Sequence, residues 1–351
     1  GGDVFALVGD TMIVAAENVQ ALFNTPFTID GQPHTATICT GTVTLDEVHH
    51  KNAVDLLKGA SIALKVAKSK GPGSNVQYDA HIGVESQERT ILLHQLRSAF
   101  ESDRLFLAFQ PQVNLENGEL VGFEALMRWR NDNGEFVRPD RFISIAEHSG
   151  LIVPLGHWAL HSALRMHKEL IELGHGQHRM AVNVSPVQLQ SEQFSHMIID
   201  ALQKHKITPE WLEIEVTEGI ALLGADRAIQ LLQQLRDIGV SIALDDFGTG
   251  YSSLSYVQQL PLTRLKIDRS FVSPMDEKTP TSKLVNVVID MGKKLGLTVL
   301  AEGVETEQQV LGLKALGCHE AQGFYFSRPM DRDTLLNSYF KADNIQADRA
   351  S

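Results

Sequence analysis

The chain has 351 residues, 43% of them hydrophobic, and a formal net charge of −12 at pH 7. This length and hydrophobic content exclude global disorder and are enough for a barrel of about 250 residues plus a smaller domain. The acidic balance argues against binding to duplex nucleic acid, which needs a basic face. It leaves room for a small phosphorylated substrate, because bound metal ions reverse the local field.

The cysteines and the lack of long apolar runs bear on the cellular compartment of the chain and on whether it crosses a membrane. Cys39 and Cys318 have no metal-ligand spacing, so we expect free thiols in a reducing, cytoplasmic compartment. No apolar run reaches the ~18 residues of a membrane span, and no signal peptide is visible. Because the chain starts at Gly1 rather than Met, we expect a fragment of a longer protein that can carry an upstream sensory or membrane region.

Residues 1–85 are predicted to form one incomplete α/β unit. The composition predicts helices at 11–23 and 48–70, and strands at 4–8, 35–43 and 75–79. Gly71-Pro72-Gly73 ends the second helix. Residues 86–104 are predicted to form a connecting helix, because their apolar side chains recur with helical spacing.

Residues 105–341 alternate between strand and helix patterns, and 342–351 form a tail. The predicted strands are 105–115, 120–129, 180–184, 212–216, 241–244, 264–267, 298–301 and 320–326. The predicted helices are 157–173, 194–205, 226–238, 253–259, 282–295 and 307–316. Eight such strands indicate an α/β fold with a closed (β/α)8 barrel. The four-residue connection 116–119 predicts a hairpin, so one strand should run antiparallel.

The strand at 241–244 ends in two adjacent carboxylates, Asp245 and Asp246, followed by a Gly-Thr-Gly loop. Adjacent like charges repel, and a shared cation makes the arrangement favourable. In a barrel, the carboxyl ends of the strands meet at one face. Oxygen ligands arrive there from successive strands as Glu124, Asn183, Glu215, Asp245, Asp246 and Glu302.

This set of hard oxygen donors, without Cys or His, predicts Mg²⁺ or Mn²⁺ rather than zinc alone. Two ions about 3.5–4 Å apart, bridged by Asp245, fit the number of donors and suit an in-line displacement at phosphorus. Glu302 could accept the proton of the attacking water, and Lys266 could hold that water. The competing interpretation pairs Lys266 structurally with a carboxylate; Glu218 or Asp268 alone would be taken as an ordinary cap or surface charge.

Eight motifs in order carry a family resemblance: Gln110-Pro111, Glu124-Ala125-Leu126-Met127-Arg128-Trp129, Val182-Asn183-Val184-Ser185, Glu215-Val216-Thr217-Glu218, Asp245-Asp246-Phe247-Gly248-Thr249-Gly250, Leu265-Lys266-Ile267-Asp268, Ala301-Glu302-Gly303-Val304-Glu305 and Gln322-Gly323. Over residues 89–341 the chain resembles the EAL-domain cyclic di-GMP phosphodiesterases. The resemblance implies hydrolysis of cyclic di-GMP to linear pGpG with two Mg²⁺ or Mn²⁺ ions. It implies that the metal ligands are Glu124, Asn183, Glu215, Asp245, Asp246 and Glu302.

The resemblance also implies roles for other residues. Glu302 matches the general base, and Lys266 matches the lysine that contacts the attacking water. The matches to the substrate pocket are Gln110, Leu126, Arg128, Glu305 and Gln322. Glu218 matches the anchor of loop 246–253, which couples dimerisation to metal occupancy, so the resemblance implies a homodimer formed through the barrel. Phe324 stands where a tyrosine is common.

The first 88 residues resemble the C-terminal part of a GGDEF, or diguanylate cyclase, domain. Gly1-Gly2-Asp3-Val4-Phe5 matches its signature loop, and residues 60–68 resemble its late helix. Val4 replaces the loop glutamate, and the preceding half of the domain lies outside this chain. We therefore expect no cyclase activity, and a role in packing or linking rather than in nucleotide sensing.

Two alternatives to an active phosphodiesterase stay open. The barrel could be a non-catalytic receptor for cyclic di-GMP, or a scaffold for other proteins. Receptors of this type usually lack a metal ligand or the general base, and none of these residues is missing here. The sequence therefore favours the enzyme.

Overall fold

The computed structural model describes residues 4–47, 52–223, 225–248, 254–276 and 280–340. The chain divides into two compact units, residues 1–95 and 96–351, each described by itself below. Three predicted features lie outside the described residues: the loop residues Gly1-Gly2-Asp3, most of loop 246–253 and the tail 342–351. Within the described part of the chain, no helix has the length and apolar character needed to cross a membrane.

The first unit packs helix α2 onto a small parallel pair of strands. Its elements are α1 (Ala16–Ala21), β1 (Phe27–Ile29), β2 (Gln32–His34), β3 (Thr40–Thr42), α2 (Ala53–Lys70), β4 (Asn75–Gln77) and α3 (Ala80–Glu101), which continues into the second unit. Asn52 caps α2 by accepting from the Asp55 amide at 2.9 Å. Ala63, Ala67 and Val76 form its buried core.

Two predictions for this unit are wrong. Residues 4–8 form no strand, and the helix predicted at 11–23 is reduced to Ala16–Ala21. A strand needs a partner for its backbone hydrogen bonds, and among the described residues none pairs with 4–8. The predicted strand at 35–43 survives only as Thr40–Thr42, which pairs with Asn75–Gln77. The hairpin of β1 and β2 was not predicted.

The second unit is an α/β barrel. Its strands are β5 (Leu105–Asn114), β6 (Leu120–Arg130), β7 (Phe136–Val137), β8 (Arg179–Val184), β9 (Leu212–Thr217), β10 (Ser241–Phe247), β11 (Arg264–Ile267), β12 (Thr298–Ala301) and β13 (Glu320–Ala321). Its α-helices are α4 (Pro139–Ser149), α5 (Ile152–Glu172), α6 (Pro186–Leu189), α7 (Phe194–His205), α8 (Ala225–Asp237), α9 (Leu254–Val257), α10 (Arg269–Val272), α11 (Pro280–Lys294), α12 (Glu307–Leu316) and α13 (Arg332–Leu335). Short 3-10 or π turns occupy Pro209–Trp211, Glu218–Leu223, Ser273–Asp276 and Leu336–Phe340.

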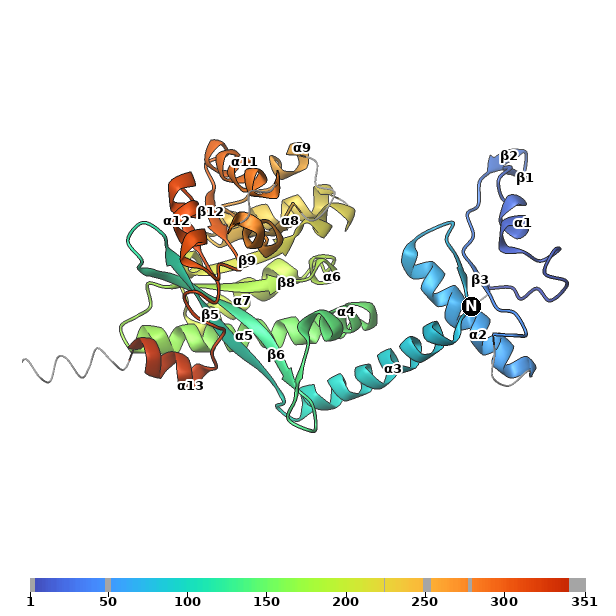
Figure 1. Ribbon diagram of the computed structural model, residues 1–351, viewed down its shortest axis with the longest axis horizontal. Helices are drawn as coiled ribbons and strands as arrows, with labels where there is room; N and C mark the ends of the chain where they lie inside the picture. The colour runs from blue at the N-terminus through green and yellow to red at the C-terminus, as the bar shows by residue number, and fades with distance from the viewer. Residues whose placement is uncertain (1–3, 48–51, 224, 249–253, 277–279, 341–351) are drawn as a thin grey trace, which may run out of the picture. The chain divides into compact units, whose positions relative to one another are not determined.

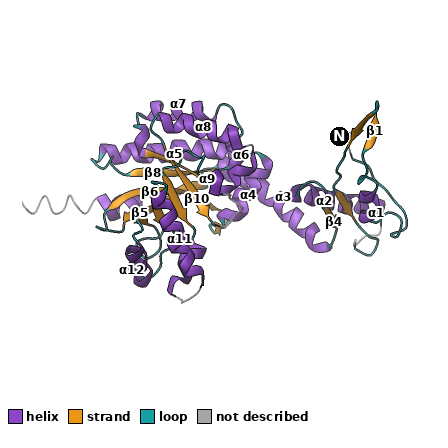
Figure 2. Cartoon of the chain, turned by 90° about the horizontal axis from the view of Figure 1, so that it is seen from above, coloured by secondary structure: helices purple, strands orange, loops and turns teal. Residues whose placement is uncertain are grey.

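Within the described residues, eight strands close the barrel in the order β5-β13-β12-β11-β10-β9-β8-β6, because β6 pairs back onto β5. Figure 1 shows β5 and β6 side by side. β5 runs antiparallel to both neighbours, as the hairpin prediction expected. β7 adds to β6 outside the closed ring. The larger helices, including α5, α7 and α8, surround the strands (Figure 2).

Side chains along a barrel strand alternate between two faces, one packed in the apolar core and one pointing into the barrel. On β9, Leu212, Ile214 and Val216 belong to the apolar core. Side chains two residues apart share one strand face, so Glu213 and Glu215 both point to the other side, into the barrel. The interior is therefore polar at these levels, and its charged groups sit on rigid strands.

The last strand is shorter than predicted, ending at Ala321 rather than at residue 326. The chain turns at Gly323, where an added Cβ would lie 2.1 Å from the Val304 carbonyl oxygen. The Val304 amide donates to the Gln322 carbonyl at 3.1 Å, and Tyr325 donates to the Val304 carbonyl at 2.9 Å. This close approach ties the segment after β12 to the segment after β13.

Candidate active site

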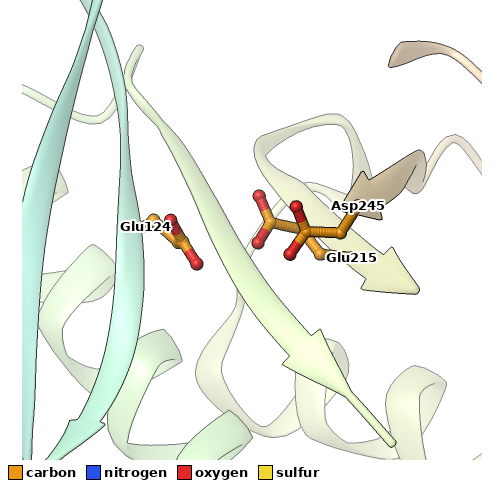
Figure 3. A group of neighbouring side chains, drawn as sticks. All are labelled: Glu124, Glu215 and Asp245. Carbon is orange, nitrogen blue, oxygen red and sulfur yellow. The ribbon is translucent and has the colours of Figure 1, made fainter. Parts of the chain in front are cut away.

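Acidic side chains from three strands, and from the residue that follows β12, gather at the carboxyl end of the barrel. Oxygen atoms of Glu124 on β6, Glu215 on β9 and Asp245 on β10 lie within 4.8 Å of one another (Figure 3). Asp245 also belongs to a second group, in which its oxygen, one of Asp246 and one of Glu302 lie within the same distance. The structure thus brings these predicted ligands together in two groups that share Asp245.

Lys266 stands at the centre of four of these carboxylates. It is fully buried on β11, and its Nζ lies 2.9 Å from Glu215 and 3.1 Å from Asp245. The same Nζ lies 2.7 Å from Glu302 and 3.7 Å from Glu124. We call Lys266 and its four carboxylates the carboxylate layer. One ammonium group faces four carboxylates, so the layer carries an excess of acidic groups.

The backbone at the end of β10 is adapted to this arrangement. Asp246 has φ 54°, a left-handed conformation that residues other than glycine rarely adopt. Its amide donates to Asp245 Oδ1 at 3.0 Å, which fixes one carboxylate relative to the next. Such strain persists where surrounding structure enforces it and concentrates at functional sites.

Several of the crowded acids have raised pKa values, because burial and neighbouring negative charges disfavour their ionised forms. Burial raises the pKa of Glu302 to about 8 and, together with Asp245 and Asp268, raises the pKa of Asp246 to about 6. Burial, and next the charge of Glu124, raises the pKa of Glu215 well above its ordinary value. These shifts mean that the folded chain resists gathering so many negative charges.

Glu124 and Lys266 shift in the opposite sense, toward their charged forms. Burial by itself would raise the pKa of Glu124, but Lys266 and hydrogen bonds from Gln322 and Asn183 lower it overall. For Lys266, burial is outweighed by the surrounding carboxylates, which raise its pKa well above the ordinary value. Lys266 is therefore charged at physiological pH.

The residues present fit divalent cations. Both Glu215 carboxylate oxygens are buried and accept no hydrogen bond from the described residues, although Lys266 lies near one of them. Buried carboxylate oxygens without donors are suited to metal coordination. The donors are all oxygens, as Mg²⁺ and Mn²⁺ prefer. A divalent cation in each group would offset the acidic excess that Lys266 alone leaves.

Three amide side chains border Glu124. Asn183 is exposed and donates to Glu124 Oε1 at 2.7 Å, so it lies beside a predicted ligand. Gln322, which is buried, donates to Glu124 Oε2 at 2.5 Å and to Gln110 Oε1 at 3.0 Å. Gln110 in turn donates to the Ser327 carbonyl at 3.1 Å.

The remaining predicted residues lie around this centre. Glu218 is buried, and its Oε1 accepts from the Gly248 amide at 2.8 Å, at the start of the loop it was expected to anchor. Arg128 is half-buried on β6 and donates to the Met127 carbonyl. Leu126 is half-buried on the same strand, and Glu305 is exposed after β12.

A second charged layer lies one step deeper in the barrel, and the sequence reasoning did not predict it. Arg264 bonds to Glu213 at 3.2 Å and Glu320 at 2.8 Å, while Arg179 lies 3.0 Å from Glu320 and 3.5 Å from Glu213. Gln112 accepts hydrogen bonds from both arginines. We call these five residues the arginine layer. The signal was the i, i+2 spacing of Glu213 with Glu215 and of Arg264 with Lys266, which places each pair on one strand face.

The chain is similar to known proteins of one family. A profile of the EAL domain matches residues 93–329. The chain is 39% identical over 284 residues to the bifunctional diguanylate cyclase/cyclic di-GMP phosphodiesterase MucR of Pseudomonas aeruginosa, covering 81% of this chain and 42% of that protein. It is 35% identical over 351 residues to the cyclic di-GMP phosphodiesterase NbdA of the same organism, covering 99% and 45%.

The chain belongs to the EAL-domain family. Its fold matches a solved structure of the MucR phosphodiesterase in complex with c-di-GMP, with a TM-score of 0.67, 41% identity, and coverage of 70% of this chain and 99% of that one. It also matches the EAL enzyme Bd1971 in a cGMP-bound form, with a TM-score of 0.71, 32% identity, and coverage of 81% and 74%. The chain spans less than half the length of MucR and NbdA.

Proposed function

We propose that this EAL domain hydrolyses one phosphodiester bond of cyclic di-GMP and releases linear pGpG. The single observation that carries the proposal is the carboxylate layer, where Lys266 meets four acids at the carboxyl end of the barrel, three of them buried and Glu302 half-buried. A purely structural ion pair would need one acid for one base. The excess of acids is what a site for two divalent cations requires.

In this proposal Glu124, Asn183, Glu215, Asp245, Asp246 and Glu302 hold two Mg²⁺ or Mn²⁺ ions. Those ions would stabilise the negative charge that develops on the phosphate and would make water a stronger nucleophile. Glu302 accepts the proton as the water oxygen forms its bond to phosphorus. The P–O3′ bond breaks on the opposite side, and the O3′ oxygen leaves with the electron pair and takes up a proton from solvent to become the 3′-hydroxyl of pGpG. Lys266 donates a hydrogen bond that orients the attacking water, consistent with its place 2.7 Å from Glu302.

Substrate recognition in the proposal falls to side chains around the acids. Arg128 suits a phosphate group because its guanidinium is planar and permanently charged. Gln110 and Gln322 offer amide groups beside Glu124, and Leu126 and Glu305 complete the set. MucR and NbdA, whose names state cyclic di-GMP phosphodiesterase activity, support this choice of substrate.

Two further expectations belong to this proposal. The barrel forms a homodimer in which the loop anchored by Glu218 responds to metal binding. The first unit is a GGDEF-like remnant without cyclase activity, since Val4 replaces the loop glutamate. The alternative is a non-catalytic receptor for cyclic di-GMP. The chain has all the proposed acidic ligands and Lys266, which favours an enzyme over a receptor.

The test is a hydrolysis assay on the purified chain with cyclic di-GMP and Mg²⁺ or Mn²⁺, followed by chromatography. The proposal expects pGpG to accumulate with the wild-type chain and not with Glu124→Ala. Binding of cyclic di-GMP without turnover would instead support the receptor. Equal turnover by Glu124→Ala would exclude the proposed ligand set.

A further inference from the structure

A chain of hydrogen bonds crosses the barrel interior from the arginine layer to Glu124. Gln112 on β5 lies in its middle and is completely buried. Its Oε1 accepts from Arg264 Nη1 at 3.2 Å and from Arg179 Nη2 at 3.4 Å. Its Nε2 donates to Gln322 Oε1 at 3.1 Å, and Gln322 Nε2 donates to Glu124 Oε2 at 2.5 Å.

The charges at the two ends fix the direction of this chain. A guanidinium group has donors and no acceptor, so the Gln112 atom beside Arg264 must be its carbonyl oxygen. Gln112 therefore presents its NH2 group to Gln322, whose carbonyl oxygen turns toward it. The Gln322 NH2 group is then left for Glu124, and an ionised carboxylate can only accept. Each amide is held in one of its two orientations.

We propose that Gln112 is a positioning residue for Glu124 and so sets the affinity of the site for divalent cations. It acts by fixing the Gln322 amide, which holds Glu124 Oε2 in place. The inference rests on the proposed function, because it takes Glu124 as a metal ligand. Loss of an outer-shell partner of a ligand typically lowers metal affinity about 10–100-fold.

One substitution separates this role from simple filling of the core. Gln112→Glu keeps the size of the side chain and its acceptors for Arg264 and Arg179, so a purely structural role survives. The introduced carboxylate cannot donate to Gln322 and instead attracts its NH2 group. The Gln322 carbonyl oxygen is then turned toward Glu124, where two oxygens repel. Added negative charge by itself would tighten cation binding, so the two effects have opposite signs.

The experiment measures Mn²⁺ binding to the full 351-residue chain by the electron paramagnetic resonance signal of free Mn²⁺. We expect the Mn²⁺ dissociation constant to rise about 10-fold or more in Gln112→Glu and in Gln112→Leu. Thermal unfolding verifies that each variant is folded. If Gln112→Leu does not fold, Gln112→Glu still provides the test, because it keeps both arginines paired.

Gln309→Glu is the matched control. Gln309 is also buried; its Oε1 accepts from the Thr306 amide at 3.1 Å and its Nε2 donates to the Val272 carbonyl at 3.4 Å. The substitution removes a buried donor in the same way, without a contact to Gln322 or Glu124 in the structure. We expect it to lower stability and leave the Mn²⁺ dissociation constant unchanged.

The outcomes separate this inference from the proposed function. Unchanged or tighter Mn²⁺ binding by folded Gln112→Glu, with a wild-type chain that hydrolyses cyclic di-GMP, overturns the positioning role alone. A wild-type chain that neither binds Mn²⁺ nor hydrolyses cyclic di-GMP overturns the proposed function, and the inference falls with it. Weaker binding in Gln112→Glu and not in Gln309→Glu supports the positioning role.

Discussion

The carboxylate layer and the arginine layer share strands β9 and β11, on which their residues lie two apart, and they differ in charge balance. In the arginine layer, Arg179 and Arg264 face Glu213 and Glu320, so positive and negative groups are matched. In the carboxylate layer, one lysine faces four acids. The balanced layer is matched by the chain's own charges, whereas the unbalanced layer has carboxylates that could hold cations.

This difference in charge balance distinguishes buried charges that only support the fold from buried charges that form a ligand site. In a buried ion pair with matched partners, the attraction between the charges offsets only part of the free energy lost on removing them from water. Such a pair therefore adds little stability. A buried excess of one sign destabilises the folded chain unless a ligand compensates it, and the raised pKa of Glu302, to about 8, reflects that cost. Charge balance within a layer is therefore a better guide to a ligand site than burial.

The largest effect is expected from Asp246→Asn, which neutralises one acid at the end of β10. We expect turnover to fall by more than about 100-fold, the upper end of the loss caused by removing an outer-shell partner. The fold should remain, because Asp246 is only half-buried. Asp237→Asn, a change at an exposed aspartate of α8, is the control with unchanged turnover. Wild-type turnover by Asp246→Asn would contradict the two-cation assignment.

The next largest effect is on the free energy of unfolding, when the same Glu→Gln substitution is made at two positions of β9. Glu213→Gln removes a partner of Arg264 and should lower the free energy of unfolding by about 3–5 kcal/mol, since a buried charge loses its match. Glu215→Gln removes one acid from the excess, so at pH 8 with a chelator present it should raise the free energy of unfolding. Urea unfolding measures both. Two changes of the same sign would mean that the layers do not differ as described.

A third effect is a pH dependence that arises from Glu302 in the carboxylate layer and from the neighbouring Asp246. The folded-state pKa is about 8 for Glu302 and about 6 for Asp246, above the ordinary values of 4.5 and 3.8. These acids thus bind protons in the folded chain that the unfolded chain has already released. Their contribution to stability is present below about pH 4 and is lost as the pH rises toward 8.

Divalent cations bind the deprotonated acids, so they should offset this loss. We expect Mg²⁺ to raise the melting temperature at pH 8 more than at pH 5.5, by at least about 2–4 °C, the shift that corresponds to roughly 1 kcal/mol. Thermal unfolding with Mg²⁺ and with a chelator at both pH values gives the difference. An equal shift at the two pH values would argue that the cations bind elsewhere.

The smallest effect is expected from Glu218→Ala, which acts on the carboxylate layer from outside. Glu218 accepts from the Gly248 amide just after β10, so its loss should weaken Mn²⁺ binding by up to about 10-fold. A Mn²⁺ titration measures the change. A titration curve identical to the wild type would remove Glu218 from the support of the site.

The sequence predicts the barrel and the residues at the ends of its strands because both follow local rules. Strand–helix alternation fixes a parallel sheet, and closure brings its carboxyl ends together. The strand predicted at 320–326 was too long because it ends where Gly323 meets the backbone of Val304, a contact between segments that local patterns do not encode. The strand predicted at 4–8 was wrong for a related reason, since a strand depends on its partner.

The arginine layer could not be derived from strand ends, because its residues lie before them. Their i, i+2 relation to Glu215 and Lys266 was visible, but pairing of Arg264 with Glu320 and Gln112 depends on how the barrel closes. The orientations of the Gln112 and Gln322 amides likewise follow from contacts between strands distant in sequence.

The central claim is tested most directly by anomalous diffraction from crystals of this chain grown with Mn²⁺. We expect two Mn²⁺ peaks, one among Glu124, Glu215 and Asp245 and one among Asp245, Asp246 and Glu302. Crystals saturated with Mn²⁺ that show no peak within coordination distance of Asp245 would contradict it.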